Sequence, residues 1–169
     1  MMKHTYHIQP MAIEHAREIS TWTYPGEYAL YSFQPDRETL DELMGGEYFS
    51  CTESDGSLAG YFCYGAAARI PAVEAEAYPE GFLDIGLGMA PQLCGKGRGV
   101  DFLTAGMDYG RAAFPPAAFR LTVAAFNERA ISVYRKLGFE ISAALTHKIS
   151  QEPFYLMHKT AAALVPTSL

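Results

Sequence analysis

The spacing of hydrophobic and polar residues alternates between two periods along the chain and so marks the expected elements. Apolar residues at every second position predict strands, and spacings of three and four predict helices. The expected strands are HTYHIQ (4–9), EYFSCTE (47–53), LAGYFCYGA (58–66), GFLDIGLGM (81–89), FRLTVAAF (119–126), EISAALTHKI (140–149) and PFYLMHK (153–159). The expected helices cover residues 12–22, 37–44, 97–114 and 127–139.

These elements follow the order βααβββαβαββ, with about seven strands and four helices. Strands and helices alternate in the second half, which predicts a parallel pair in a mixed central sheet covered by helices, an α/β (α+β) fold. Asp36 is expected to cap the second helix, and Asp55-Gly56 to turn a hairpin after the second strand. No repeat or linker interrupts the order, so residues 1–160 are expected to form one domain and 161–169 a tail.

Composition narrows the class of protein and its partners. The 169 residues are 49% hydrophobic and 19% charged, which is typical of one globular domain. A net charge of −6 argues against nucleic acid as a partner and leaves a cationic substrate such as an amine open. Three cysteines without paired spacing predict free thiols in a cytoplasmic protein. No apolar run approaches the length of a membrane span, so no membrane partner is expected.

The segment APQLCGKGRGVDFLTAGM (90–107) places a glycine-rich, basic turn between an expected strand and an expected helix. A Walker A loop would need Ser or Thr after Lys96, where Gly97 stands, and the glycine spacing does not match a dinucleotide-binding fingerprint. What remains is Gln92-x-x-Gly95-x-Gly97, whose glycines let backbone N–H groups face an anion at a helix N-terminus. With added charge from Lys96 and Arg98, the turn predicts a pyrophosphate site; the alternative is a turn that only permits tight packing.

A second segment, LTVAAFNERAISVYRKLGF (121–139), predicts a strand followed by a capped helix. Asn127 is a favoured N-cap, and Gly138-Phe139 fit a left-handed residue followed by a hydrophobic contact at the helix end. Ala130 and Tyr134 lie four residues apart and share a face, where a small residue beside the phenol leaves room for a ligand. The alternative is that Tyr134 is a core residue of an amphipathic helix.

Strand alternation places Asp84 on the same face as Gly86 and Gly88, which are expected to clear space for a ligand. Asp84 is therefore the candidate general base, or the carboxylate that orients an amine. The alternative is that it anchors a structural hydrogen bond, as buried carboxylates commonly do.

These segments resemble the two signatures of the GNAT N-acetyltransferase superfamily. QLCGKG (92–97) is similar to its Arg/Gln-x-x-Gly-x-Gly/Ala turn between the fourth strand and the third helix. Residues 121–139 resemble its Asn-capped helix, which carries a tyrosine and ends in Gly-Phe. The resemblance is strong over residues 81–140 and topological elsewhere. It implies a GNAT-like, mixed and mostly antiparallel sheet, with acetyl-CoA as the acyl donor.

The resemblance also implies roles for individual residues. The turn would hold the pyrophosphate of acetyl-CoA, and the splayed fourth strand would form hydrogen bonds to its pantetheine arm. A backbone N–H near Met89 would polarise the thioester. The implied cofactor-binding residues are Leu87, Met89, Gln92, Gly95, Lys96, Gly97, Arg98, Gly99, Asn127 and Ala130. Tyr134 would donate a proton to the departing thiolate, which a phenol with a pKa of about 10 can do at neutral pH.

The resemblance places the acceptor under the loop between the first two helices. We expect this loop to form an aromatic cage with one acid that holds an alkylammonium group, built from Tyr24, Glu27, Tyr28 and Tyr31. The alternative is that the aromatic loop only packs on the core. The predicted activity is direct transfer of an acetyl group to a primary amine of a small molecule or peptide. Alternatives with the same fold are transfer of a longer acyl group, action on a protein N-terminus or lysine, and a non-catalytic coenzyme A-binding sensor. Family members often dimerise, which leaves a homodimer open.

Two kinds of chemistry are not expected. Cys94 lies within the turn without a partner base, so no thiol nucleophile is predicted. No metal is predicted, because ligand spacing is lacking among the histidines, which are His4, His7, His15, His147 and His158.

Overall fold

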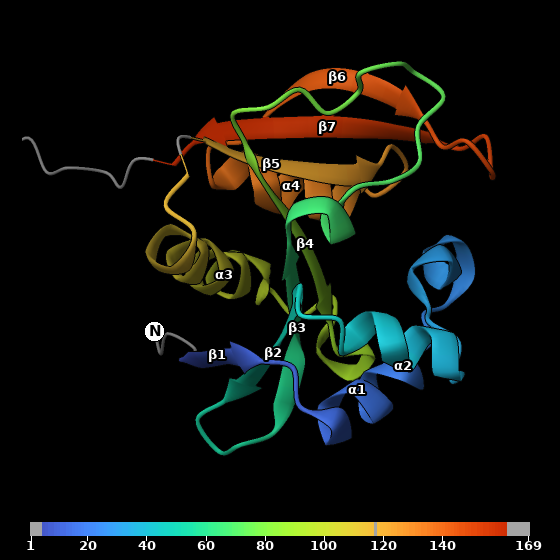
Figure 1. The fold of residues 1–169 in the computed structure, drawn as a ribbon. Helices are drawn as coiled ribbons and strands as arrows, with labels where there is room; N and C mark the ends of the chain where they lie inside the picture. Colours follow the sequence, from blue (N-terminus) through green and yellow to red (C-terminus); the bar gives the residue numbers. More distant parts are fainter. Residues whose placement is uncertain (1–4, 117, 162–169) are drawn as a thin grey trace, which may run out of the picture.

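The computed structural model describes residues 5–116 and 118–161, which form a seven-stranded sheet flanked by helices (Figure 1). The strands are β1 (Tyr6–Pro10), β2 (Tyr48–Glu53), β3 (Leu58–Tyr64), β4 (Leu83–Met89), β5 (Ala118–Ala124), β6 (Glu140–Thr146) and β7 (Pro153–Thr160). The α-helices are α1 (Ile13–Ser20), α2 (Arg37–Leu43), α3 (Gly99–Ala113) and α4 (Glu128–Lys136). The described part also contains the short 3₁₀ helices η1 (Gly26–Tyr31), η2 (Gly65–Ala68) and η3 (Pro91–Leu93). The order of strands and α-helices confirms the sequence prediction.

The sheet divides at its centre. Its strand order is β1-β2-β3-β4-β5-β7-β6, and each neighbouring pair is antiparallel except β4 and β5. These two strands pair only at Leu83–Phe119 and Asp84–Arg120. Figure 1 shows β5, β6 and β7 in one half of the molecule and β1, β2 and β3 in the other, with β4 leading between them. The mixed, mostly antiparallel sheet is as expected, and it opens where β4 and β5 part.

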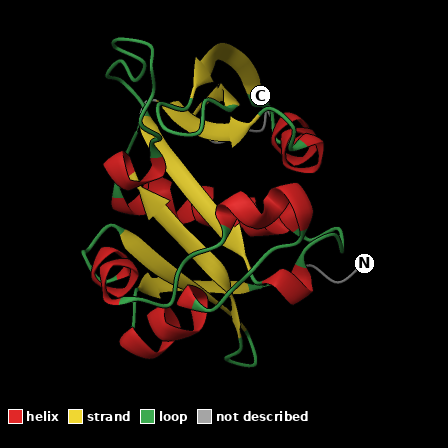
Figure 2. Cartoon of the chain, turned by 90° about the vertical axis from the view of Figure 1, so that its right-hand side faces the viewer, coloured by secondary structure: helices red, strands yellow, loops and turns green. Residues whose placement is uncertain are grey.

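A hydrophobic core covers each face of the sheet. One core packs α3 and α4 on the sheet and contains the fully buried Phe62, Phe102 and Phe119. A second packs α1 and α2 on the opposite face around Ile19 and Leu43, and a third lies against β5, β6 and β7 around Phe154. Figure 2 shows helices on both sides of the strands. Side chains from either layer can therefore reach the opening between β4 and β5.

Local capping signals act as the sequence predicts. Asp36 caps α2, because its Oδ1 accepts a hydrogen bond from the N–H three residues later at 2.8 Å. Asn127 caps α4 in the same way, with a distance of 3.1 Å. At the other end of α4, Gly138 has a φ of 94°. The N–H of Phe139 then donates to the carbonyl of Tyr134 at 3.0 Å, which closes the helix with a buried aromatic contact.

The main differences from the prediction lie at element ends. The third helix begins two residues later than expected, at Gly99, because Gly97 has a φ of 74° and is not helical. Part of the expected first inter-helix loop is the 3₁₀ helix η1. The first residue of the expected tail, Ala161, is buried, and its carbonyl accepts a hydrogen bond from Arg111 Nε. The rest of that tail, 162–169, lies outside the described residues.

Two glycines of β4 have a different role from the one expected. A Cβ atom at Gly88 would lie 2.2 Å from the ring of Tyr61, and one at Gly86 would lie 2.5 Å from Sγ of Cys63. The space above both glycines is thus filled by side chains of β3. They permit close packing of β3 on β4, and they border the cavity described below through their backbone.

A buried ion pair lies where β4 and β5 stop pairing. Arg120 donates from Nε to Oδ1 of Asp84 at 2.6 Å and from Nη2 to Oδ2 at 2.9 Å, and both side chains are 2% exposed. Nη1 of Arg120 donates to the carbonyl of Pro79 at 2.8 Å. The guanidinium also lies over the rings of Tyr78 and Phe82. All three nitrogens and both oxygens have partners, which offsets the cost of removing the two charges from water.

Replacing Asp84 by Asn should destabilise the fold, because it leaves the buried Arg120 guanidinium without its counter-charge. We expect the free energy of unfolding to fall by about 3–5 kcal/mol, the usual cost of breaking a buried pair. Chemical denaturation measures this loss. Asp108→Asn is the control, because it removes an exposed pair with Arg111 and should cost about 1 kcal/mol or less. Equal losses in the two variants would contradict the structural role of Asp84.

Candidate active site

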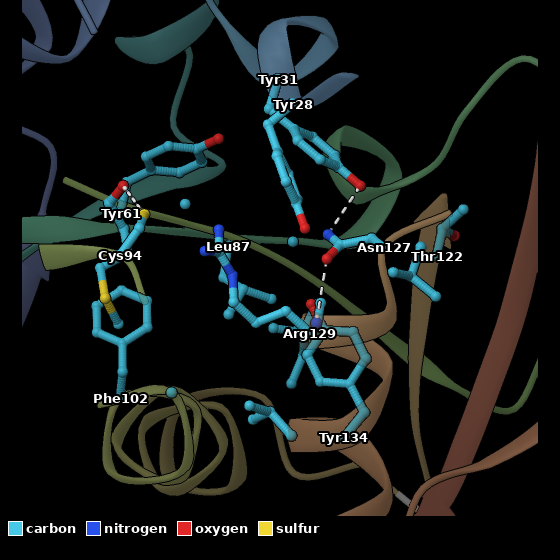
Figure 3. A pocket seen from close by; sticks show the side chains of 18 of the residues that line it. Tyr28, Tyr31, Tyr61, Leu87, Cys94, Phe102, Thr122, Asn127, Arg129 and Tyr134 are labelled. Carbon is cyan, nitrogen blue, oxygen red and sulfur yellow. Dashed lines mark hydrogen bonds between the residues drawn. The ribbon is translucent and has the colours of Figure 1, made fainter. Parts of the chain in front are cut away.

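A cavity of about 610 Å³ opens where β4 and β5 part. Its walls come from the backbone of β4, the turn before α3, one face of α4, and η1 with its neighbouring residues. Figure 3 shows Tyr28 and Tyr31 on one side of the cavity and Tyr134 on the other. Cys94 and Thr122 lie at opposite ends of this view. The cavity thus joins both predicted signatures to the predicted acceptor loop.

The turn before α3 has the backbone shape of an anion site. Gly95 and Gly97 have φ angles of 72° and 74°, in the left-handed region, and both line the cavity. Gly99 stands at the start of α3, where a Cβ atom would lie 2.8 Å from Cγ2 of Val133. Glycine at this position therefore lets α3 approach α4 closely. Because the start of α3 also lines the cavity, its first N–H groups and the positive end of its helix dipole give this end of the cavity the character of an anion site.

The side chains around the turn differ from those expected. Arg98 lines the cavity and pairs with Glu53 at 2.6 Å. Gln92 and Lys96 are exposed and are not part of the cavity wall. Arg129 of α4, which the sequence analysis missed, lines the cavity, and its Nη1 lies 3.2 Å from the Cβ position of the first turn glycine. Arg129 is therefore a cation at the turn.

The backbone of β4 presents hydrogen-bonding groups to the cavity. Ala90, just after the strand, donates its N–H to β3, so alternation turns the backbone groups of Met89 and Leu87 toward β5. β5 does not pair at these positions, and both residues line the cavity. The Met89 carbonyl accepts a hydrogen bond from the hydroxyl of Tyr24 at 2.7 Å. The Leu87 and Met89 N–H groups face the cavity, where a linear ligand could bond to them.

Tyr134 enters the cavity from α4 (Figure 3). Its hydroxyl makes no hydrogen bond to any residue of the described ranges. Burial, and to a smaller extent the nearby Tyr31, raise the pKa of this phenol, so it keeps its proton at neutral pH. Ala130 lies one turn earlier on the same wall, and Asn127 donates from Nδ2 to the Tyr31 hydroxyl at 3.2 Å. A protonated phenol is thus available to a ligand.

The predicted acceptor loop contributes tyrosines but no acid. Tyr24, Tyr28 and Tyr31 line the cavity, whereas Glu27 is exposed and does not. The guanidinium of Arg129 lies 4.7 Å from the ring centroid of Tyr28. It therefore occupies a face that an alkylammonium group would need. The expected cage with one acid is not assembled.

Asp84 is not placed to act as a base. It does not line the cavity, and its side chain is 2% exposed. Besides the two bonds from Arg120, its Oδ2 accepts a hydrogen bond from Nε of Arg69 at 2.9 Å. Because guanidinium groups engage both oxygens, an amine in the cavity has no path to this carboxylate. The geometry fits the alternative that Asp84 anchors structural hydrogen bonds. Arg69, which no sequence motif indicated, lies at the cavity wall.

Other reactive groups are few. Cys94 Sγ lies 3.6 Å from the carbonyl oxygens of Met89 and Ala90, and burial raises the pKa of its thiol, which disfavours the thiolate. Within residues 5–116 and 118–161, no three His, Cys, Asp or Glu side chains cluster so as to hold a metal; His4 lies outside these ranges. The same ranges contain no helix that could span a membrane.

Comparison with known proteins adds to this geometry. Residues 13–139 match the sequence model of the acetyltransferase (GNAT) family. The fold is similar to a GNAT-family acetyltransferase from Bacillus anthracis (TM-score 0.70, 15% identity, 92% of this chain and 95% of that one). It is also similar to a chimera of the spermidine N-acetyltransferase SpeG from Vibrio cholerae and hSSAT (TM-score 0.69, 18% identity, 92% of this chain and 95% of that one). The spermidine/spermine N-acetyltransferase SpeG from Vibrio cholerae in complex with manganese ions is a further similar structure (TM-score 0.65, 15% identity, 92% of this chain and 92% of that one). A search of curated proteins found no match.

Gly97→Ala should weaken the binding of acetyl-CoA. Alanine disfavours the φ of 74° at this position, so the turn must shift or bear the strain. A left-handed conformation costs roughly 1–2 kcal/mol for a residue with a Cβ, which corresponds to a loss of affinity of about 5- to 30-fold. Isothermal titration calorimetry with acetyl-CoA measures it.

Gly56→Ala is the matched control. Gly56 turns the β2–β3 hairpin with a φ of 88°, and like Gly97 it has open space for a Cβ, but it is not part of the cavity wall. It should lower the thermal midpoint about as much and leave the affinity for acetyl-CoA unchanged. Wild-type affinity in Gly97→Ala would mean that the turn does not hold the ligand.

Proposed function

The chain belongs to the GNAT family of acetyltransferases, and from this premise we propose that it transfers an acetyl group from acetyl-CoA directly to a primary amine of a small molecule. One observation carries the proposal. The left-handed turn before α3, the unpaired N–H groups of Leu87 and Met89 in β4 and the unbonded hydroxyl of Tyr134 line a single cavity. Acetyl-CoA, when bound, supplies the activated acyl thioester. The residues around it bind, orient and move a proton.

Each wall of the cavity has its own role in this proposal. The turn and the start of α3 bind the pyrophosphate, and Arg129 adds a charge-assisted contact. The N–H groups of Leu87 and Met89 bind the pantetheine arm and polarise the thioester carbonyl, as preorganised backbone donors do. Tyr134 gives its proton to the departing thiolate, because its hydroxyl is protonated and has no competing partner.

The covered acceptor side favours a small molecule. The rings of Tyr28 and Tyr31 lie 5.5 and 6.4 Å from that of Phe126, and Asn127 bonds to the Tyr31 hydroxyl. These contacts close η1 onto the start of α4, where a peptide acceptor would need an open groove. Similar structures include spermidine N-acetyltransferases, and at identities of 15–18% their names support an amine acceptor only in general terms. A cytoplasmic location and a homodimer stay predictions.

Deprotonation of the amine is assigned to water rather than to a side chain. No Asp, Glu or His among the described residues lines the cavity, and Asp84 is committed to its two arginines. The amine that attacks is thus the neutral fraction present in solution or formed through bound water.

Tyr134→Phe should lower kcat by about 10²- to 10⁴-fold, the range for loss of a general acid, and leave the affinity for acetyl-CoA nearly unchanged. Release of free thiol in the presence of an amine measures kcat, and calorimetry measures binding. Tyr109→Phe is the control, because Tyr109 is a partly buried tyrosine that does not line the cavity. An unchanged kcat in Tyr134→Phe would remove this residue from the mechanism. Binding without turnover by the wild type would favour a coenzyme A sensor.

The dependence of kcat/KM on pH should be set by the pKa of the acceptor amine. We expect kcat/KM to rise with the neutral fraction of the amine and to shift with the pKa of each amine tested. Because burial raises the pKa of Tyr134, no fall from its ionisation should occur below about pH 10. Steady-state rates from about pH 6 to pH 10 with two amines of different pKa test this. A rise at one fixed pH for both amines would instead reveal a basic side chain.

A further inference from the structure

The cavity carries positive charge that no acid on its wall balances. Arg69, Arg98, Arg129 and Lys136 line it, and in the part of the chain that the structure describes no carboxylate does. The charge of Arg98 is paired with that of Glu53, which does not line the cavity. The whole chain has a net charge of −6, so the cavity is opposite in sign to the protein around it. Such a cavity attracts anions and repels polycations.

Arg69 contributes charge that its own ion pair does not neutralise. Asp84 already accepts two hydrogen bonds from Arg120, so one carboxylate stands between two guanidinium groups. Arg69 uses only Nε for this contact, and its side chain is 39% exposed. Its two terminal nitrogens make no hydrogen bond to the described residues. They are available to a ligand.

Arg69 is held at the end of the cavity away from the turn. Its guanidinium lies 5.3 Å from the ring centroid of Tyr78. The Tyr78 hydroxyl is 2.8 Å from Oγ1 of Thr122 and accepts a hydrogen bond from the N–H of Ile70 at 3.1 Å. Figure 3 shows Thr122 on the opposite side of the cavity from Cys94, which belongs to the turn. The pyrophosphate site and the Arg69 site are therefore separate.

We propose that Arg69 binds a carboxylate of the acceptor, so that the acceptor is an amino-acid-like molecule with both a primary amine and a carboxylate. This inference rests on the proposed function and narrows its substrate. Two free terminal nitrogens of a guanidinium match the two oxygens of a carboxylate. A polyamine would bring a second cation near Arg69 with no acid to pair it. The face of Tyr28 that could hold that cation is taken by Arg129.

The test uses pairs of amines that differ only in the carboxylate. The pairs are L-phenylalanine with 2-phenylethylamine and 4-aminobutyrate with propylamine, so that both a near and a remote carboxylate are sampled. Spermidine and O-phosphoethanolamine represent a polycation and a phosphate. Thiol release gives kcat/KM at a fixed concentration of acetyl-CoA. In at least one pair, the carboxylate-bearing amine should be better by about 10-fold or more.

Variants of Arg69 connect this preference to the residue. Arg69→Gln should raise KM for the preferred acceptor about 10- to 100-fold and leave KM for acetyl-CoA unchanged. The variant should fold, because Asp84 keeps both bonds from Arg120. Arg69→Lys keeps the charge without the fork and should recover part of the loss. Arg37→Gln, the control, removes a cation that is 92% exposed and outside the cavity, and it should change neither constant.

The outcomes separate this inference from the proposed function. A rise in KM confined to the carboxylate-bearing amine, with an unchanged thermal midpoint, supports the role of Arg69. Equal kcat/KM within both pairs, or a preference for spermidine or O-phosphoethanolamine, overturns the inference and leaves acetyl transfer intact. If acetyl-CoA does not raise the thermal midpoint and no amine releases thiol, the proposed function fails as well.

Discussion

Asp84 and Arg120 form a buried ion pair at the last position where the two central strands of the sheet are joined. Up to this point β4 and β5 are parallel neighbours, and after it each pairs on only one edge. The opened edge of β4 keeps N–H groups that a closed sheet would use internally. Those groups form one wall of the cavity. The ion pair thus serves the site by fixing where the sheet ends and the cavity begins.

The other walls reach the cavity through close packing between layers. Gly99 lets the start of α3 approach Val133 of α4, and Gly106 further along α3 faces the ring of Phe62. A Cβ at either glycine would meet its neighbour at less than 3.0 Å, so larger residues would separate the helices or lift α3 from the sheet. The glycine turn precedes α3, whereas Tyr134 belongs to α4. They share one cavity because these small residues keep the helices in contact.

The charge of the cavity sets it apart from the rest of the chain. The protein as a whole is acidic, whereas its cavity is lined by arginines, two of which pair with acids outside the cavity. Glu53 orients Arg98, and Asp84 orients Arg69, without either acid entering the cavity. The acids position the cations, and the cations line the cavity. A buried carboxylate thus orients an arginine of the cavity wall without lining the cavity itself.

The sequence by itself determined the features that depend on neighbours along the chain. Asn127 begins α4 and Gly138 ends it, because a cap or a left-handed residue acts within one helical turn. The glycine turn was identified for the same reason. Only the tertiary structure decided what Asp84, Arg69 and Arg129 do. Alternation along a strand shows which face a side chain takes, but not which distant segment covers that face. Asp84 was expected beside a ligand and instead lies between two arginines that are 15 and 36 residues away.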